Sequence, residues 1–277
     1  MTHPLTDLLP DRFRRKLRTG RDLARAKQRA LQDDCLPTAC EPLDRLLGGG
    51  LARGRLAELV AWGSSGRFAM ALGALAATTR GGQAAALIDL GDGLEPHGAA
   101  EAGIVLERLL WTRPRCMKEA LMATEAVIAC GMPLVVLELG VPPVPGGRGG
   151  EAFWRRIVRE AEKRRSAVLV ASPYRVTGTT AHQVVEATER RADWSDTDLD
   201  PRLLTGLSSR LRLVRAPGRQ GTDRAERLQL AAPSAVATPP PSPQKPSSGK
   251  PSPKHPQADN VLLDDPLMAA SPRRAIA

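Results

Sequence analysis

The residues most suggestive of chemistry lie between Ala61 and Phe68, where an apolar run gives way to a turn of small residues. The stretch reads Ala-Trp-Gly-Ser-Ser-Gly-Arg-Phe. A phosphate-binding loop follows the pattern GxxxxGK[ST], in which backbone N–H groups and a helix N-terminus surround a phosphate. The small residues at the centre of that pattern are Gly63, Ser64, Ser65 and Gly66. The spacing therefore predicts a strand, a phosphate loop and a helix in direct succession.

Three of the four defining positions of the pattern have changed. Ala61 stands where a glycine would permit a turn closed to residues with a Cβ. Arg67 replaces the lysine and keeps its charge, but a planar guanidinium is not equivalent to a compact ammonium. Phe68 replaces the hydroxyl that would hold Mg²⁺, and a phenyl ring cannot ligate a metal. We expect weak nucleotide binding at most, without efficient hydrolysis.

Alternating short β-rich runs and helical patterns surround this loop. The predicted strands are Leu56–Ala61, Ala84–Leu90, Leu109–Thr112, Leu134–Leu139 and Ala167–Ala171, followed by Arg210–Val214 and Arg227–Ala231. The predicted helices are Arg67–Thr79, Met117–Cys130 and Glu151–Arg164. Strands that alternate with helices of this length indicate an α/β fold with a mainly parallel sheet covered on both faces.

Several spaced motifs resemble bacterial RecA in the same order. The segment from Leu43 to Glu58, with its glycines at 48–50, resembles the lead-in to the RecA phosphate loop, and Gly63–Gly66 resembles the loop itself. The run from Ala86 to Pro96 resembles the second strand of RecA and its following loop. The resemblance covers about Leu36 to Val176 and implies a RecA-like, P-loop NTPase-type core.

The departures from RecA fall at the residues that carry its chemistry. The resemblance places the catalytic glutamate at Gly91, the Walker B aspartate at Glu138 and the γ-phosphate-sensing glutamine near Pro173. Together with the changes at Arg67 and Phe68, these losses predict a pseudo-ATPase rather than an enzyme.

A RecA-like core of this size with a basic N-terminal helix resembles the ImuA family, which is also described as SulA-like. That resemblance implies a non-catalytic adaptor in SOS-induced translesion synthesis, with an ImuB-type inactive Y-family polymerase, an error-prone DnaE-type polymerase and RecA as partners. Two alternatives stay open. One is a weak, DNA-stimulated ATPase, and the other is a SulA-like inhibitor of cell division.

The formal charge of +10 is unevenly distributed. Residues 1–31 hold nine Lys/Arg against three acids, whereas residues 32–231 are nearly neutral. Leu17, Ala24 and Leu31 are seven residues apart, which predicts a helix with a narrow apolar stripe among arginines. This segment is either a solvated helix packed on the core or a docking helix for a partner or DNA. Its candidate contact residues are Arg14, Arg15, Lys16 and Arg18.

Two further groups of charged residues have a structural and a functional interpretation. Arg155, Arg156 and Arg159 lie on a predicted helix and form either a solvated face or a contact for DNA phosphates. The carboxylates Asp89, Asp92 and Glu95 are interpreted as solvated loop residues rather than a catalytic cluster. The four cysteines and four histidines lack the spacing of a metal site, so no metal is expected.

Composition divides the chain into three parts. They are a basic helical segment over residues 1–34, the core over 35–231, and a tail over 232–277 that holds eleven of the 24 prolines. The composition of the tail predicts disorder, and its cluster Asn260–Met268 is either without function or a short motif that orders on binding. No run of about 18 apolar residues and no apolar signal core occur, so a cytoplasmic or nucleoid-associated protein is expected, without membrane contact.

Overall fold

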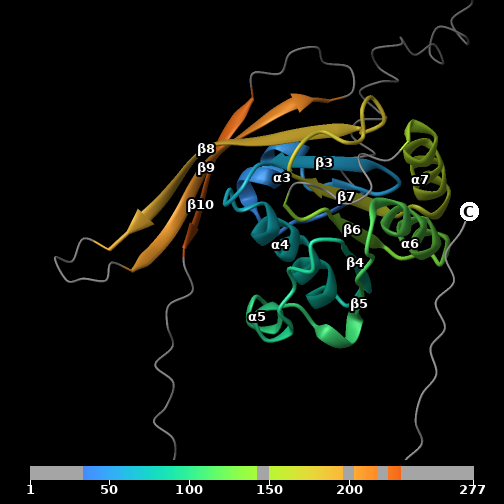
Figure 1. Ribbon diagram of the computed structural model, residues 1–277, viewed down its shortest axis with the longest axis horizontal. Helices are drawn as coiled ribbons and strands as arrows, with labels where there is room; N and C mark the ends of the chain where they lie inside the picture. Colours follow the sequence, from blue (N-terminus) through green and yellow to red (C-terminus); the bar gives the residue numbers. More distant parts are fainter. Residues whose placement is uncertain (1–33, 142–149, 196–202, 217–223, 232–277) are drawn as a thin grey trace, which may run out of the picture. The chain divides into compact units, whose positions relative to one another are not determined.

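The residues that the structure describes form an eight-stranded sheet with helices packed on both faces (Figure 1). The computed structural model describes residues 34–141, 150–195, 203–216 and 224–231. The chain divides into two units, Met1–Pro233 and Ser234–Ala277, and every described residue belongs to the first. The basic segment and the tail predicted from the sequence lie outside the described residues.

The sheet has the strand order β10-β9-β8-β3-β7-β6-β4-β5. Its strands are β3 (Leu56–Ala61), β4 (Ala85–Asp89), β5 (Leu109–Thr112), β6 (Leu134–Glu138), β7 (Ala167–Ser172), β8 (Gln183–Trp194), β9 (Leu204–Arg215) and β10 (Ala225–Ala231). All neighbours from β8 to β5 pair in parallel, whereas β8–β9 and β9–β10 pair antiparallel. A separate antiparallel pair joins β1 (Cys35–Leu36) to β2 (Leu51–Ala52).

The helices of the described residues are α3 (Glu41–Leu47), α4 (Arg67–Arg80), α5 (Pro96–Glu101), α6 (Met117–Ala129) and α7 (Glu151–Arg164), with a 3₁₀ turn at Leu106–Arg108. Alternate residues of each central strand enter two different cores. In β6, Leu134 and Val136 join the core that holds α4, whereas Val135 and Leu137 join the core beneath α6 and α7. A strand buried on both faces must be apolar throughout, which is why β6 reads as a continuous apolar run.

The predicted α/β class and mainly parallel sheet are confirmed, and the predicted helix over 151–164 has the observed bounds. The long strand β8 was not predicted, and β9 is much longer than the predicted Arg210–Val214. Only the first residues of β8 are buried, and from Thr188 onward it carries mainly exposed polar side chains. This composition gives no apolar run, so the strand depends on pairing with β3 and β9. The short helices α3 and α5 were also absent from the prediction.

Strand β8 continues beyond the end of β3, because the last pair between them joins Ala187 to Ala61. Its register with β9 shifts between Thr188 and Arg191, and Glu189 has a positive φ of 51°. A bulge of this kind re-aims the side chains next to it. Here the side chain of Arg190 reaches the loop that follows β3, where it donates to the carbonyl of Trp62 at 2.6 Å.

A buried carboxylate fixes the connection between β7 and β8. Glu58, in the middle of β3, is 1% exposed. Its Oε1 accepts from the backbone N–H groups of Val176 at 2.6 Å and Thr177 at 3.3 Å, and its Oε2 accepts from the Thr177 hydroxyl at 2.5 Å. The connection is therefore held against the sheet by an acceptor that sits inside it.

Replacing this carboxylate with an apolar side chain should destabilise the fold strongly. In Glu58→Leu the donors on Val176 and Thr177 lose their acceptor, so we expect the free energy of unfolding to fall by about 3 kcal/mol. Glu58→Gln keeps one carbonyl acceptor and should lose less. Urea unfolding followed by circular dichroism compares the three proteins, and an unchanged midpoint for Glu58→Leu would contradict the bracing role.

Candidate nucleotide site

The loop predicted to bind phosphate lies at the carboxyl end of the parallel strands. Strand β3 ends at Ala61, the turn 63–66 follows, and α4 begins at Arg67. Gly63 and Gly66 have φ values of 59° and 83°, in the left-handed region that favours glycine. At the same edge, Asp89 at the end of β4 pairs in register with Glu138 at the end of β6. The expected strand–turn–helix arrangement is thus present.

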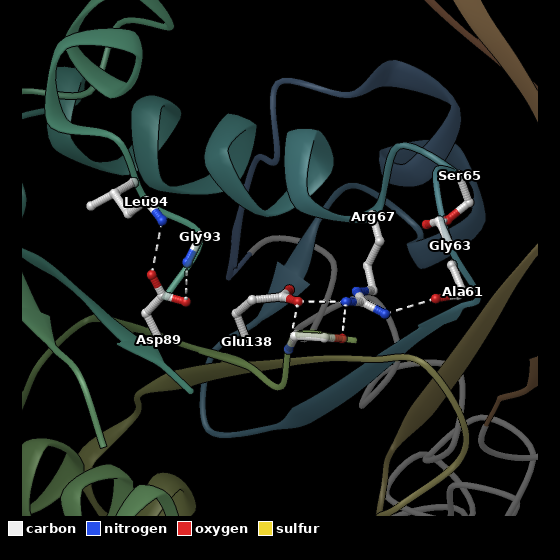
Figure 2. A network of polar contacts seen from close by, with 9 residues as sticks. Ala61, Gly63, Ser65, Arg67, Asp89, Gly93, Leu94 and Glu138 are labelled. Atoms are coloured by element: carbon white, nitrogen blue, oxygen red, sulfur yellow. Dashed lines mark hydrogen bonds and ion pairs between the residues drawn. The ribbon is translucent and has the colours of Figure 1, made fainter. Parts of the chain in front are cut away.

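The side chain of Arg67 points into the protein (Figure 2). Its Nη1 donates to the Ala61 carbonyl at 2.7 Å, and its Nη2 donates to Glu138 Oε1 at 2.6 Å and to the Gly140 carbonyl at 2.5 Å. Arg67 and Glu138 are 6% and 2% exposed, so this is a buried ion pair. It joins the first turn of α4 to the end of β6, at the two positions where the RecA resemblance places the phosphate-binding lysine and the Walker B acid.

Strands β8, β9 and β10 contribute to the other side of the loop. The Ser209 hydroxyl donates to the carbonyl of Ser65 at 3.2 Å, and Ser65 is fully buried. A Cβ on Gly66 would lie 2.6 Å from a methyl of Leu230 and 3.1 Å from one of Leu228. These contacts join residues more than 140 positions apart, so no local sequence signal could have located them.

Phe68 and Gly91 are both closely packed. They stand where the RecA resemblance expects a hydroxyl residue and the catalytic glutamate. The ring of Phe68 lies 3.7 Å from where a Cβ on Gly93 would stand, and it packs against the core. A Cβ on Gly91 would lie 2.5 Å from the Cα of Gly140 and 3.0 Å from its nitrogen. The backbones after β4 and β6 therefore touch at the position where the RecA resemblance expects a glutamate.

Asp89 corrects the interpretation of the carboxylates after β4 as solvated loop residues. It is 0% exposed and accepts from the backbone N–H groups of Gly93 at 3.2 Å and Leu94 at 2.9 Å (Figure 2). It also accepts from the indole of Trp111 at 3.3 Å. Asp89 thus shapes the loop that follows it. Asp92 and Glu95 are exposed as expected, and hydrogen bonds from Arg113 and from Gly98 N–H, respectively, lower their pKa values.

Burial dominates the electrostatics of the ion pair. Desolvation raises the pKa of Glu138 to about 7, against the lowering by Arg67 and by the Gly140 N–H, and the nearby Asp89 adds to the increase. Glu138 Oε2 and Arg67 Nε are buried and have no hydrogen-bond partner among the residues that the structure describes. A raised pKa means that the folded protein binds this proton more tightly than the unfolded chain. The contribution of Glu138 to stability therefore falls as the pH rises from about 4.5 to about 7.

These side chains do not fit a magnesium nucleotide. Phe68 offers no ligand atom, one oxygen of Glu138 is held by Arg67, and the Asp89 carboxylate is engaged by three donors. Within the described parts of the chain, no group of three or more His, Cys, Asp or Glu residues is arranged to hold a metal ion. The contacts of Arg67 attach the phosphate loop to the rest of the protein.

The other candidate contact residues are placed as follows. Arg155 pairs with Glu151 on α7, and Arg156 pairs with Glu125 on α6, whereas Arg159 is exposed and forms no ion pair with the described residues. Two of the three cations are thus partly neutralised, and a DNA contact at α7 remains a prediction. The residues from Arg14 to Arg18 lie outside the described part of the chain. No helix among the described residues is both long and apolar enough to cross a membrane.

Removing the cation of the buried pair should destabilise the protein in a pH-dependent way. Arg67→Met leaves the Glu138 carboxylate buried without its counter-ion, so we expect a loss of about 3 kcal/mol in the free energy of unfolding at pH 8. The pKa of Glu138 should rise further without Arg67. At pH 6 the carboxyl then takes up a proton, and the loss should be clearly smaller. Urea unfolding at both pH values measures the difference.

The double variant Arg67→Met with Glu138→Leu is the matched control. It replaces the pair with apolar side chains of similar size, so its stability should stay within about 1 kcal/mol of the natural protein at pH 8. Equal stability of the single variant and the natural protein at pH 8 would show that the ion pair does not hold the loop.

Adding a methyl group at Gly91 should destabilise the protein more than adding one at Gly93 in the same loop. In Gly91→Ala the new Cβ meets the backbone of Gly140, so we expect a loss of about 2 kcal/mol from the forced shift. In Gly93→Ala the Cβ makes only an ordinary contact with the Phe68 ring, and the loss should stay below about 1 kcal/mol. Thermal unfolding ranks the two variants, and a reversed order would refute the close contact between the two loops.

The chain is similar in sequence to known proteins over the segment that contains this site. The RecA N-terminal domain family matches residues 15–145, beginning within the basic segment and thus earlier than Leu36. RecA of Bartonella tribocorum is 36% identical over 106 residues, which cover 38% of this chain and 30% of that protein. RecA of Thermus thermophilus is 32% identical over 150 residues, which cover 51% of this chain and 44% of that protein. The matches thus span less than half the length of these relatives.

A solved structure extends the likeness in fold. A RadB recombinase superposes with a TM-score of 0.52 at 17% identity, over 69% of this chain and 94% of that one. That superposition supports the fold alone. The structure thus has a RecA/RadB-like α/β fold, and the sequence matches show similarity to the RecA N-terminal domain over part of the chain.

Proposed function

We propose that this protein is a non-catalytic RecA-like adaptor of the ImuA type, which assembles polymerases for DNA-damage-induced translesion synthesis. The observation that carries the proposal is the internal use of Arg67. A cation that serves a nucleotide must be free to reach its phosphates, whereas Arg67 donates to Ala61, Glu138 and Gly140. Its release would leave the Glu138 carboxylate buried and unpaired, at a cost of several kcal/mol.

The surrounding contacts support the same proposal. Catalysis of phosphoryl transfer depends on positioned cations and metal ligands. At the corresponding positions this chain has the ring of Phe68 and the closely packed backbone of Gly91. What the domain retains is a rigid parallel sheet with covered faces, on which partner-binding surfaces are well positioned. The partners that the ImuA resemblance suggests are an ImuB-type protein, an error-prone DnaE-type polymerase and RecA, acting in the cytoplasm on damaged DNA.

A variant without charge at the loop tests the proposal. The double variant Arg67→Met with Glu138→Leu should keep the fold but has neither the loop cation nor the Walker B acid. If the protein is an adaptor, the variant should capture the ImuB-type protein as well as the natural chain does. It should also restore damage-induced mutation to a deletion strain. Co-purification and mutation frequency measure the two outcomes.

The alternative function, a DNA-stimulated ATPase, predicts the opposite result for the natural protein and the double variant. A DNA-stimulated ATPase would release phosphate in the presence of single-stranded DNA, and the double variant would lose both that release and the induced mutation. Such a result would replace the adaptor proposal. Failure of the natural chain to bind an ImuB-type protein would also count against it.

A further inference from the structure

Strands β8, β9 and β10 carry a polar cleft, and one of its lining residues, Ser209, also contacts the phosphate loop. Side chains alternate along β9: Ser209, Leu211 and Leu213 are buried, while Arg210 and Arg212 are exposed on the opposite face. The cleft on this part of the sheet has a volume of about 590 Å³. Its lining residues are Glu189, Arg191, Asp193, Ser208, Ser209, Arg210, Ala225, Glu226, Arg227 and Gln229.

Two arginines oppose each other across this cleft. Arg210 on β9 and Arg227 on β10 are register partners, and both are exposed. Like charges directly opposite each other destabilise an antiparallel pair. Arg210 is balanced by Glu189 at 3.0 Å, but Arg227 forms no ion pair with any residue that the structure describes. The cleft therefore contains an unneutralised guanidinium that an incoming anion would stabilise.

The other lining residues indicate which kind of anion fits. Carboxylates of Glu189, Asp193 and Glu226 are interspersed with the arginines, so a continuous phosphate backbone would meet repulsion along its path. None of the lining residues is aromatic, so nothing in the cleft stacks on bases. Isolated carboxylates on a flexible chain avoid these acids and accept bidentate bonds from guanidinium groups.

We propose that this cleft binds an acidic peptide segment of a partner protein, with Arg210 and Arg227 as its carboxylate-binding residues. The inference rests on the proposed adaptor function, and it identifies the surface through which the adaptor would bind a partner. Strand β10 is the last strand of its sheet, so an extended peptide can lie along it. Beyond the cleft, Trp194 is paired in register with Leu204, and both are about half exposed. They offer an apolar contact for a hydrophobic residue next to the acids.

Binding of a defined probe tests this assignment. The probe is a fluorescein-labelled octapeptide of glycine and serine that carries two separated glutamates (the diglutamate peptide), and the protein is the full chain, with fluorescence anisotropy as the readout. Arg210→Gln and Arg227→Gln should each weaken binding about tenfold, because each removes a charge-assisted hydrogen bond. Arg212→Gln is the matched control, since Arg212 is exposed on the same face of β9, pairs with Glu186 and does not line the cleft. It should bind like the natural protein.

Thermal stability distinguishes a loss of binding from a loss of folding, and cross-linking distinguishes binding at the cleft from binding elsewhere on the chain. Arg227→Gln should melt no lower than the natural protein, because it relieves the opposed charges. A photo-cross-linking form of the diglutamate peptide should label residues 203–231. Labelling only within residues 1–31, or equal affinity of all variants, would overturn the proposal. Preference for octathymidylate over the diglutamate peptide at the same residues would replace the peptide with nucleic acid and overturn it as well. Capture of an ImuB-type protein is measured separately, so the adaptor function can survive this failure.

Discussion

The ion pair between Arg67 and Glu138 constrains the site more than any other contact. Two opposite charges out of water are stable only when geometry and extra hydrogen bonds offset their desolvation. Here the Ala61 and Gly140 carbonyls supply those bonds, at 2.7 and 2.5 Å. The end of β3, the first turn of α4 and the loop after β6 are held together by one guanidinium. These hydrogen bonds attach the phosphate loop to the sheet.

The neighbouring loops have shapes that suit this closed arrangement. Gly140 accepts from Arg67, donates to Glu138 and touches Gly91, so the loops after β4 and β6 approach each other through backbone atoms alone. Asp89 fixes the loop after β4 by accepting from Gly93 and Leu94. At Gly91, where the RecA resemblance places a glutamate, the space for a larger side chain is taken by the backbone of another loop.

The sequence predicted the parallel sheet, most of its strands and the changed loop positions, since each of these has a local signal in apolar runs or in motif spacing. It did not predict the direction of Arg67, because the same residue type can face a phosphate or an internal acid. The burial of Asp89 was missed for a similar reason: its partners are backbone N–H groups and an indole, which leave no charge pattern. Strand β8 was not predicted from the sequence, because its outer half is polar and depends on pairing with a neighbouring strand.

Strand β9 connects the phosphate loop with the cleft. Ser209, which contacts the phosphate loop, and Arg210, which lies on the opposite face of the strand, both line the cleft. A slip of one residue in the β9–β10 register would exchange the two faces, bringing charge to the loop and leucines to solvent. Because the packing of Leu228 and Leu230 against Gly66 fixes that register, it also fixes Arg227 opposite Arg210. The closed loop and the charged face are thus consequences of one strand pairing, and a surface built this way needs no nucleotide to take its shape.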